Sequence, residues 1–314
     1  MRRGYDESQI VAAHRKRTAV ASALIFLAIP AVIALGVILF NGRNYMMVSL
    51  LILALTMLPF FMVFERRKPK AREIVLIAMM CALTVCAQLI CGVTVPVRAG
   101  TAIIIACGIA LGPEAGFLIG ALARFVLNFY AGHGPWSPWQ MFCWGILGFL
   151  AGLAFNRANL EKKHSRNFRV VMGPVLCIAF SLMVAYLSYL LFPPADGAGF
   201  WGWRLYAFGA AGLVLGILVQ KTRLPADDLT LTLFTFFTTF IIYGGAMNIF
   251  TMISAASIPG NPEISWDALK IYYISGVPYD LGHAATAAVF NFIFGAKLIQ
   301  KLERIKLKYG IYRG

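Results

Sequence analysis

The sequence has few acidic residues and little charge of any kind. Asp and Glu number 13 against 28 Lys and Arg, and charged residues make up 13% of the 314 residues, whereas hydrophobic residues make up 60%. A soluble domain of this length needs many more polar side chains to cover its surface. The composition therefore excludes a soluble protein and predicts one that resides in a lipid bilayer.

The motifs of several common chemistries are also missing. The sequence contains no GxxxxGK[ST], HExxH or GxSxG and no pair of acids within a predicted span, which argues against P-loop ATP hydrolysis and leaves intramembrane hydrolysis without a visible apparatus. The six cysteines have no CxxC spacing, so we expect no metal site, no disulfide framework and no cofactor. The basic residues are scattered over short loops, which argues against a nucleic-acid partner.

Apolar runs long enough to cross about 30 Å of hydrocarbon recur along the whole chain. No alternating pattern of a β-barrel is present, so the sequence predicts an all-α polytopic membrane protein. The segment 101–111 is too short to cross alone, and Leu111-Gly112-Pro113 predicts a tight turn into the next helix. The predicted helices are 19–40, 45–64, 73–91, 101–111, 113–130, 139–156, 170–192, 205–220, 229–256 and 279–297.

The distribution of basic residues orients this bundle. Most Lys and Arg lie in alternate loops and in the two terminal tails, 1–18 and 297–314. Under the positive-inside rule both termini are cytoplasmic, and the excess positive charge also contacts anionic lipid.

The basic segment 65–72 separates an N-terminal tail and accessory transmembrane hairpin, residues 1–72, from the rest. Residues 157–228 begin and end on the cytoplasmic side and contain two predicted helices, so they form a hairpin that can be inserted without reorienting its neighbours. The sequence thus predicts a six-helix core made of 73–156 and 229–314, the latter ending in a basic cytoplasmic tail, with two added hairpins.

The segment 132–145, GHGPWSPWQMFCWG, has the most specific pattern. Its glycines and prolines predict a stiff, tight turn at the outer end of two spans. Tryptophans at this depth can simply anchor the protein at the interface. The combination of Trp136 and Trp139 with His133 and Gln140 instead favours a lid over a bound small molecule.

Other polar residues near the predicted spans are further candidates. Asn128 lies one helical turn beyond Arg124, and a charged side chain within a span is normally paired, faces a cavity or reaches the interface. Gln88 ends the helix 73–91, Arg98 follows in the outer loop, and Thr101 offers a hydroxyl. Asn248 by default holds helices together. Asp280 and His283 open the predicted last helix, where Asp280 suits an N-terminal cap or the pair reaches the outer face of a cavity.

These residues resemble those of a known family. The segment 108–155 resembles the second to fourth helices of substrate-binding S components of energy-coupling factor (ECF) transporters, in particular a subgroup with a GxGPWxPWQM loop. Ala78 and Ala82 resemble the first-helix alanine motif of such proteins, and 277–304 is similar to their last helix and basic tail. The two extra hairpins are a departure from the compact six-helix form.

The resemblance implies a non-enzymatic subunit that captures a vitamin at the outer face of a bacterial plasma membrane. Its partners would be a transmembrane coupling subunit, contacted through Ala78 and Ala82, and two ATP-binding subunits. The subgroup is often associated with cobalamin-type ligands. The residues that would surround or cover the ligand are Gln88, Arg98, Thr101, Asn128, His133, Trp136, Trp139, Gln140 and Asn248.

Two other classes of function remain open from the residues alone. One is an intramembrane enzyme that acts on a lipid or isoprenoid, with Arg124, His133, Asp280 and His283 as its polar machinery. The other is a membrane scaffold without a ligand, in which the tryptophans are interface anchors.

Overall fold

The computed structural model describes residues 20–40, 47–55, 71–94, 97–155, 167–168, 211, 224–225, 228–256, 258, 260–261 and 265–309. They divide into two compact units. The first unit is Met1–Gly152 with Lys297–Gly314, and the second is Leu153–Ala296. Apart from residue 211, the predicted helices 170–192 and 205–220 lie outside the described residues.

Five helical stretches in the described part of the chain are long and apolar enough to cross a membrane, and they confirm an all-α polytopic membrane protein. They are Ala71–Gly92, Pro113–Ala131, Trp136–Phe155, Asp228–Ala256 and Asp267–Lys306. The described residues also include two short antiparallel strands of two residues each. In this pair β1 (Asn167–Phe168) is hydrogen-bonded to β2 (Leu224–Pro225).

The described residues between 20 and 55 in the first unit are helical. They include η1 (Leu24–Ala28), α2 (Ile29–Phe40) and the helical residues 47–55. A Cβ built on Gly36 would lie 2.8 Å from Val48, so the two helical segments meet closely. The Phe26 ring also packs edge to face on Phe149, with ring centroids 6.0 Å apart. The first half of the predicted N-terminal hairpin therefore packs against the helices that follow it.

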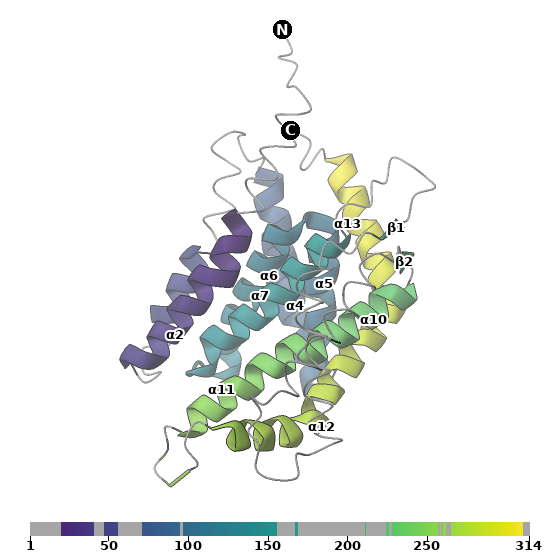
Figure 1. Ribbon diagram of the computed structural model, residues 1–314. Helices are drawn as coiled ribbons and strands as arrows, with labels where there is room; N and C mark the ends of the chain where they lie inside the picture. Colours follow the sequence, from purple (N-terminus) through teal and green to yellow (C-terminus); the bar gives the residue numbers. More distant parts are fainter. Residues whose placement is uncertain are drawn as a thin grey trace. The chain divides into compact units, whose positions relative to one another are not determined.

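Four consecutive helices form the centre of the first unit, as the sequence predicts. They are α4 (Ala71–Thr94), α5 (Ala99–Leu111), α6 (Pro113–Ala131) and α7 (Trp136–Phe155), drawn in blue to teal in Figure 1. All thirteen residues of α5 are buried. At 1.5 Å per residue α5 is about 20 Å long, too short to cross the hydrocarbon alone. Gly112 has a φ of 105° and makes the predicted tight turn into α6.

Glycines let α5, α6 and α7 approach to backbone contact. A Cβ on Gly108 or Gly116 would overlap the carbonyl of Gly148, and one on Gly120 would lie 2.5 Å from the carbonyl oxygen of Trp144. Side chains of any size at these positions would push the helices apart, which is why small residues line such interfaces in membranes. The glycine spacing in the sequence is therefore a packing pattern.

The C-terminal helix α13 (Ala296–Lys308) contributes a cap to the first unit. The Nζ atom of Lys306 donates to the carbonyl oxygen of Ala110 over 3.2 Å, in the last turn of α5. The last carbonyls of a helix have no partner within the helix and attract cations. The basic tail therefore stabilises the end of the buried helix in addition to any role in orientation.

The second unit is built on two long antiparallel helical stretches. The first joins α10 (Asp228–Thr238), η2 (Thr239–Gly244) and α11 (Gly245–Ala256). The second joins α12 (Trp266–Phe290) to η3 (Asn291–Gly295). Asn291 Nδ2 donates to Thr235 Oγ1 over 2.7 Å, and the Tyr273 hydroxyl donates to the Gly245 carbonyl over 3.0 Å. Such hydrogen bonds between helices are a common form of cohesion in membranes.

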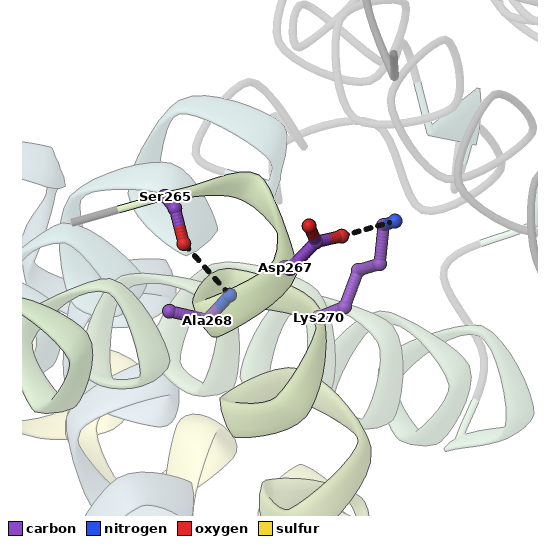
Figure 2. Close-up of polar contacts among 4 residues, drawn as sticks. All are labelled: Ser265, Asp267, Ala268 and Lys270. Atoms are coloured by element: carbon purple, nitrogen blue, oxygen red, sulfur yellow. Dashed lines mark hydrogen bonds and ion pairs between the residues drawn. The ribbon is translucent and has the colours of Figure 1, made fainter. Parts of the chain in front are cut away.

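The last long helix begins earlier than the sequence predicts, at Trp266 instead of residue 279. Ser265 is its N-terminal cap, because its hydroxyl accepts from the Ala268 backbone N–H over 3.2 Å, and Asp267 pairs with Lys270 over 2.9 Å in the first turn (Figure 2). Pro278 lies inside the helix. The prediction that Asp280 caps this helix is therefore wrong.

Candidate ligand-binding site

The turn between α6 and α7 is shorter than predicted, because α7 begins at Trp136. Gly132, with a φ of 92°, ends α6, and Trp136 and Trp139 belong to the first turn of α7. The Trp136 side chain is 39% exposed, and its Nε1 donates to the Gly132 carbonyl over 3.3 Å. Its ring lies against Gly134, where a Cβ would collide with it. Trp136 thus covers the turn, while Trp139 is half-buried.

A chain of hydrogen bonds joins α6 to α7 beneath this turn. Arg124 Nε donates to Gln140 Oε1 over 2.8 Å. Asn128 Nδ2 donates to Ser137 Oγ over 3.1 Å and, more weakly, to Gln140 Oε1 over 3.4 Å. The Gly134 backbone N–H also donates to Ser137 Oγ, over 3.1 Å. The structure thus brings the predicted residues Asn128 and Gln140 together with Arg124.

His133 lies at the end of this chain of hydrogen bonds. Its Nδ1 is 3.3 Å from Ser137 Oγ, and its ring contacts Phe125 and Phe129 with centroids 5.1 and 4.7 Å away. Burial and, second, the Arg124 guanidinium lower the pKa of His133 below its ordinary value. The imidazole is therefore neutral at physiological pH and can donate from one nitrogen and accept at the other.

A second group of contacts lies around Trp144, which is 1% exposed. The Arg124 Cζ atom lies 5.2 Å from the centroid of the Trp144 ring, a cation–π distance. A Cβ on Gly100, at the start of α5, would lie 3.1 Å from the same ring. Gln88 Oε1 accepts from the Gly100 backbone N–H over 3.2 Å, so Gln88 caps the N-terminus of α5.

Three polar atoms of this region are shielded from solvent and, among the residues that the structure describes, have no hydrogen-bond partner. They are Asn128 Oδ1, His133 Nε2 and Trp144 Nε1. Buried polar atoms are nearly always hydrogen-bonded, and each one left over costs about 1–3 kcal/mol. Their concentration on α6, the turn and α7 makes this region the candidate ligand-binding site.

The remaining predicted residues of the first unit have varied positions. Arg98 immediately precedes α5 and is half-buried, whereas Thr101 is fully buried inside α5. Ala78 and Ala82 lie on the exposed side of α4. Their neighbours on that side, Ile74, Val75, Met79 and Leu83, are also exposed. A large apolar face of α4 is thus left without a partner from the described part of this unit.

Asn248 belongs to the second unit, where it is buried and donates from Nδ2 to Asp280 Oδ2 over 2.8 Å. Cβ atoms on Gly244 and Gly276 would collide with the Asp280 carboxylate and the Asn248 amide respectively. The two glycines thus make room for a tight polar pair between the helices. His283 packs edge to face on Tyr243, with centroids 4.4 Å apart.

Ser137 is the site residue that the sequence did not reveal. It is a small side chain with a hydroxyl group between two conspicuous tryptophans. Its partners are Asn128 on α6, nine positions earlier, and Gly134 and His133 in the turn, three and four positions earlier. Only the spacing of four from His133, one helical turn, offers a signal in the sequence.

A comparison with known protein families matches the segment that contains α4, α5, α6 and α7. The family model described as ECF-type riboflavin transporter, S component, matches residues 68–196, which is less than half of the chain. Residues 68–196 are thus similar to the S components of ECF transporters. The S component is a membrane subunit of a transporter, so the family supports a substrate-binding transport protein. No curated protein and no solved structure matches the chain significantly.

The limits of the S-component match bear on the organisation of the chain. The match begins at residue 68 and therefore leaves out the N-terminal hairpin. It includes α4, α5, α6 and α7, and thus the whole chain of hydrogen bonds from Arg124 to His133. It continues to residue 196, into the segment 157–228, so the division of the chain into a core and an inserted hairpin stays a prediction.

Proposed function

We propose that this S-component chain binds a planar heteroaromatic vitamin, with riboflavin as the first candidate, at the outer ends of α6 and α7. The observation that supports this function is the set of unsatisfied polar atoms, Asn128 Oδ1, His133 Nε2 and Trp144 Nε1, inside the segment that matches the family. Riboflavin is the ligand in the description of the matching family.

The chemistry of the site suits a ligand of this class. Its side chains offer neutral donors and acceptors beside aromatic rings, and its charged member, Arg124, already donates to Gln140. Small-molecule sites combine apolar and aromatic walls with a few polar groups that fix orientation. A flat ring system can stack on the aromatic side chains while its polar edge meets the unsatisfied atoms.

The proposed path of the ligand is inward, with energy from other subunits. Basic residues in the N- and C-terminal tails orient both termini to the cytoplasm of a bacterial cell, so the His133 turn faces outward. The exposed apolar face of α4 with Ala78 and Ala82 is the proposed contact with the transmembrane coupling subunit, which two ATP-binding subunits would serve. A contribution of Gln88, Arg98, Thr101 or Asn248 to ligand binding stays a prediction.

Direct binding to the purified full-length protein tests this function. Small molecules released from the detergent-purified protein are identified by mass spectrometry, and riboflavin is titrated by the quenching of its fluorescence, beside thiamin and cobalamin. We expect saturable riboflavin binding that Asn128→Ala weakens at least tenfold, about 1.4 kcal/mol.

The matched control is Asn261→Ala, because Asn261 is an exposed asparagine whose amide donates to the Ala255 carbonyl. This variant should bind as the unaltered protein does. Saturable binding of cobalamin or thiamin alone would keep the S-component function and replace the ligand. A folded protein that binds none of the three and releases no vitamin would contradict the proposed function.

A further inference from the structure

The hydrogen bonds between Arg124 and His133 have only one consistent set of directions. A guanidinium has donors and no acceptor, so the atom of Gln140 that faces Arg124 Nε must be the amide oxygen. The same oxygen faces Asn128, so the atom of Asn128 that approaches it must be the amide nitrogen. Arg124 therefore determines the orientation of both amides.

The direction of the next bond follows from the capacity of the Ser137 hydroxyl. An aliphatic hydroxyl has one hydrogen and two acceptor lone pairs. Two N–H groups, Asn128 Nδ2 and the Gly134 backbone, both donate to Ser137 Oγ over 3.1 Å and use both lone pairs. The hydroxyl hydrogen is therefore left for the third neighbour, His133 Nδ1, at 3.3 Å.

We propose that Ser137 is a positioning residue that holds His133 in the tautomer with hydrogen on Nε2, so that this N–H donates to an acceptor atom of the bound ligand. This inference rests on the proposed function for its ligand and on the hydrogen bonds alone for the tautomer. Since Nδ1 accepts from Ser137, a neutral imidazole must carry its hydrogen on Nε2. Within the described part of the chain, that buried N–H has no acceptor.

The donors and acceptors of the site then determine which hydrogen-bonding groups a ligand must present. His133 Nε2–H and Trp144 Nε1–H are donors, and Asn128 Oδ1 is an acceptor. The matching ligand presents a carbonyl oxygen or an unprotonated ring nitrogen to His133 and an N–H or O–H group to Asn128. A ligand with a protonated nitrogen opposite His133 would leave two donors facing each other, which is a strong basis for rejection.

The tautomer can be tested by nitrogen NMR of the full-length protein labelled with ¹⁵N-histidine. Correlation through the ring protons shows which nitrogen carries the hydrogen, and the spectrum of His133→Gln identifies the His133 signals. We expect a protonated Nε2 and a free Nδ1 in the unaltered protein at a pH where the ring is neutral. Ser137→Thr, which keeps a hydroxyl, should preserve this pattern, whereas Ser137→Ala should yield a mixture of tautomers. A protonated Nδ1, or a Ser137→Ala spectrum identical to that of the unaltered protein, would overturn the positioning role.

Ser137→Cys gives a second variant where Ser137→Ala does not fold, because the thiol is close in size but a weak donor and acceptor. Riboflavin is the probe for the donor role. On binding, the His133 Nε2 signal should shift, and Ser137→Ala should weaken affinity by about three- to tenfold while Ser137→Thr restores it. Riboflavin binding with an unchanged Nε2 signal would overturn the donor role. A protein that binds no riboflavin but shows the expected tautomer would contradict the ligand of the proposed function and leave the positioning role standing.

Discussion

Arg124 and Gln140 connect α6 to α7 through a hydrogen bond of 2.8 Å between guanidinium Nε and amide Oε1. The bond lies within the two helices, since Arg124 precedes the last turn of α6 and Gln140 follows the first turn of α7. Hydrogen bonds to a charged group contribute about 1.5–3 kcal/mol. The geometry of the turn therefore depends on a polar contact within the helices and not on the turn alone.

Replacing Gln140 by Leu should loosen the connection between α6 and α7. The variant removes the acceptor of Arg124 while keeping a side chain of similar volume, so we expect a loss of about 1.5–3 kcal/mol of stability and a lower melting temperature in detergent. Gln140→Glu is the matched control, since it keeps an oxygen opposite the guanidinium and should melt at or above the temperature of the unaltered protein. Equal melting of the Leu and Glu variants would show that this hydrogen bond contributes nothing.

Removing both tryptophans of the first turn of α7 tests whether they cover the ligand. The variant with Trp136→Ala and Trp139→Ala should bind riboflavin at least tenfold more weakly, about 1.4 kcal/mol, because two aromatic surfaces are lost from the cover of the site. Phe292→Ala removes an exposed aromatic ring from η3 and serves as the control. Unchanged affinity in a folded double variant would make the tryptophans interface anchors.

Enlarging the small residues of α4 tests the proposed coupling surface. Ala78→Leu with Ala82→Leu should leave ligand affinity unchanged and abolish uptake by cells that contain the coupling and ATP-binding subunits, because leucine prevents close approach of another helix. Met79→Leu changes an exposed neighbour on the same face with little change of volume, and should transport normally. Uptake by the double leucine variant would show that this exposed face of α4 contacts lipid and not the coupling subunit.

The lowered pKa of His133 predicts that acid destabilises the first unit. The unfolded chain takes up a proton on this residue near pH 6.5, the ordinary value for histidine, while the folded protein takes it up only at lower pH. Stability therefore falls as the pH decreases from about 6.5 toward the folded pKa, and the loss levels off below it.

The measurement for this pH effect is the melting temperature across that range for the unaltered protein and for His133→Gln. The variant should lose part of the acid sensitivity. His283→Gln changes a histidine of the second unit and should retain the His133 effect. Identical pH profiles for His133→Gln and the unaltered protein would mean that His133 titrates alike in the folded and unfolded chains.

Two glycines of α12 should respond in opposite ways to the same substitution. Gly276→Ala should destabilise the second unit, because the added Cβ collides with the Asn248 amide that holds Asp280. Gly282→Ala adds the same methyl group where nothing lies within 4 Å, and should be neutral or stabilising, since alanine favours a helix by about 1 kcal/mol. Equal melting temperatures for the two variants would show that the Asn248–Asp280 pair tolerates displacement.

Hydrophobic patterning predicted the helices of the first unit well, because runs of apolar residues are bounded there by real turns. The turn at Gly112 follows from residue type, and the structure adds the close packing of Gly108, Gly116 and Gly120. The start of α12 at Trp266 was not predicted from the sequence, because Pro278 and the polar residues around it favour a helix boundary locally. The structure accommodates Pro278 within the helix, where Asp280 has Asn248 as its partner on another helix.

The candidate site was only partly predictable. Asn128, His133 and Gln140 stand out as polar residues among apolar ones, and the structure joins them. Trp144 is indistinguishable in sequence from Trp136, although one is buried beneath Arg124 and the other is 39% exposed. Ser137 has a role that depends on three partners meeting at one oxygen atom. Such convergence is a property of the folded chain and has no counterpart in composition or spacing.

The burial of α5 has a consequence for how the protein responds to its lipid environment. Every residue of this helix is surrounded by protein, with Gln88 at its first N–H groups and Lys306 at its last carbonyls. A change of bilayer thickness makes lipid-facing helices tilt or draws their flanking residues toward the interface. It reaches α5 only through those neighbours. The helix that packs against Trp144 through Gly100 is thereby insulated from the thickness of the membrane, and ligand affinity should vary little between short-chain and long-chain lipids.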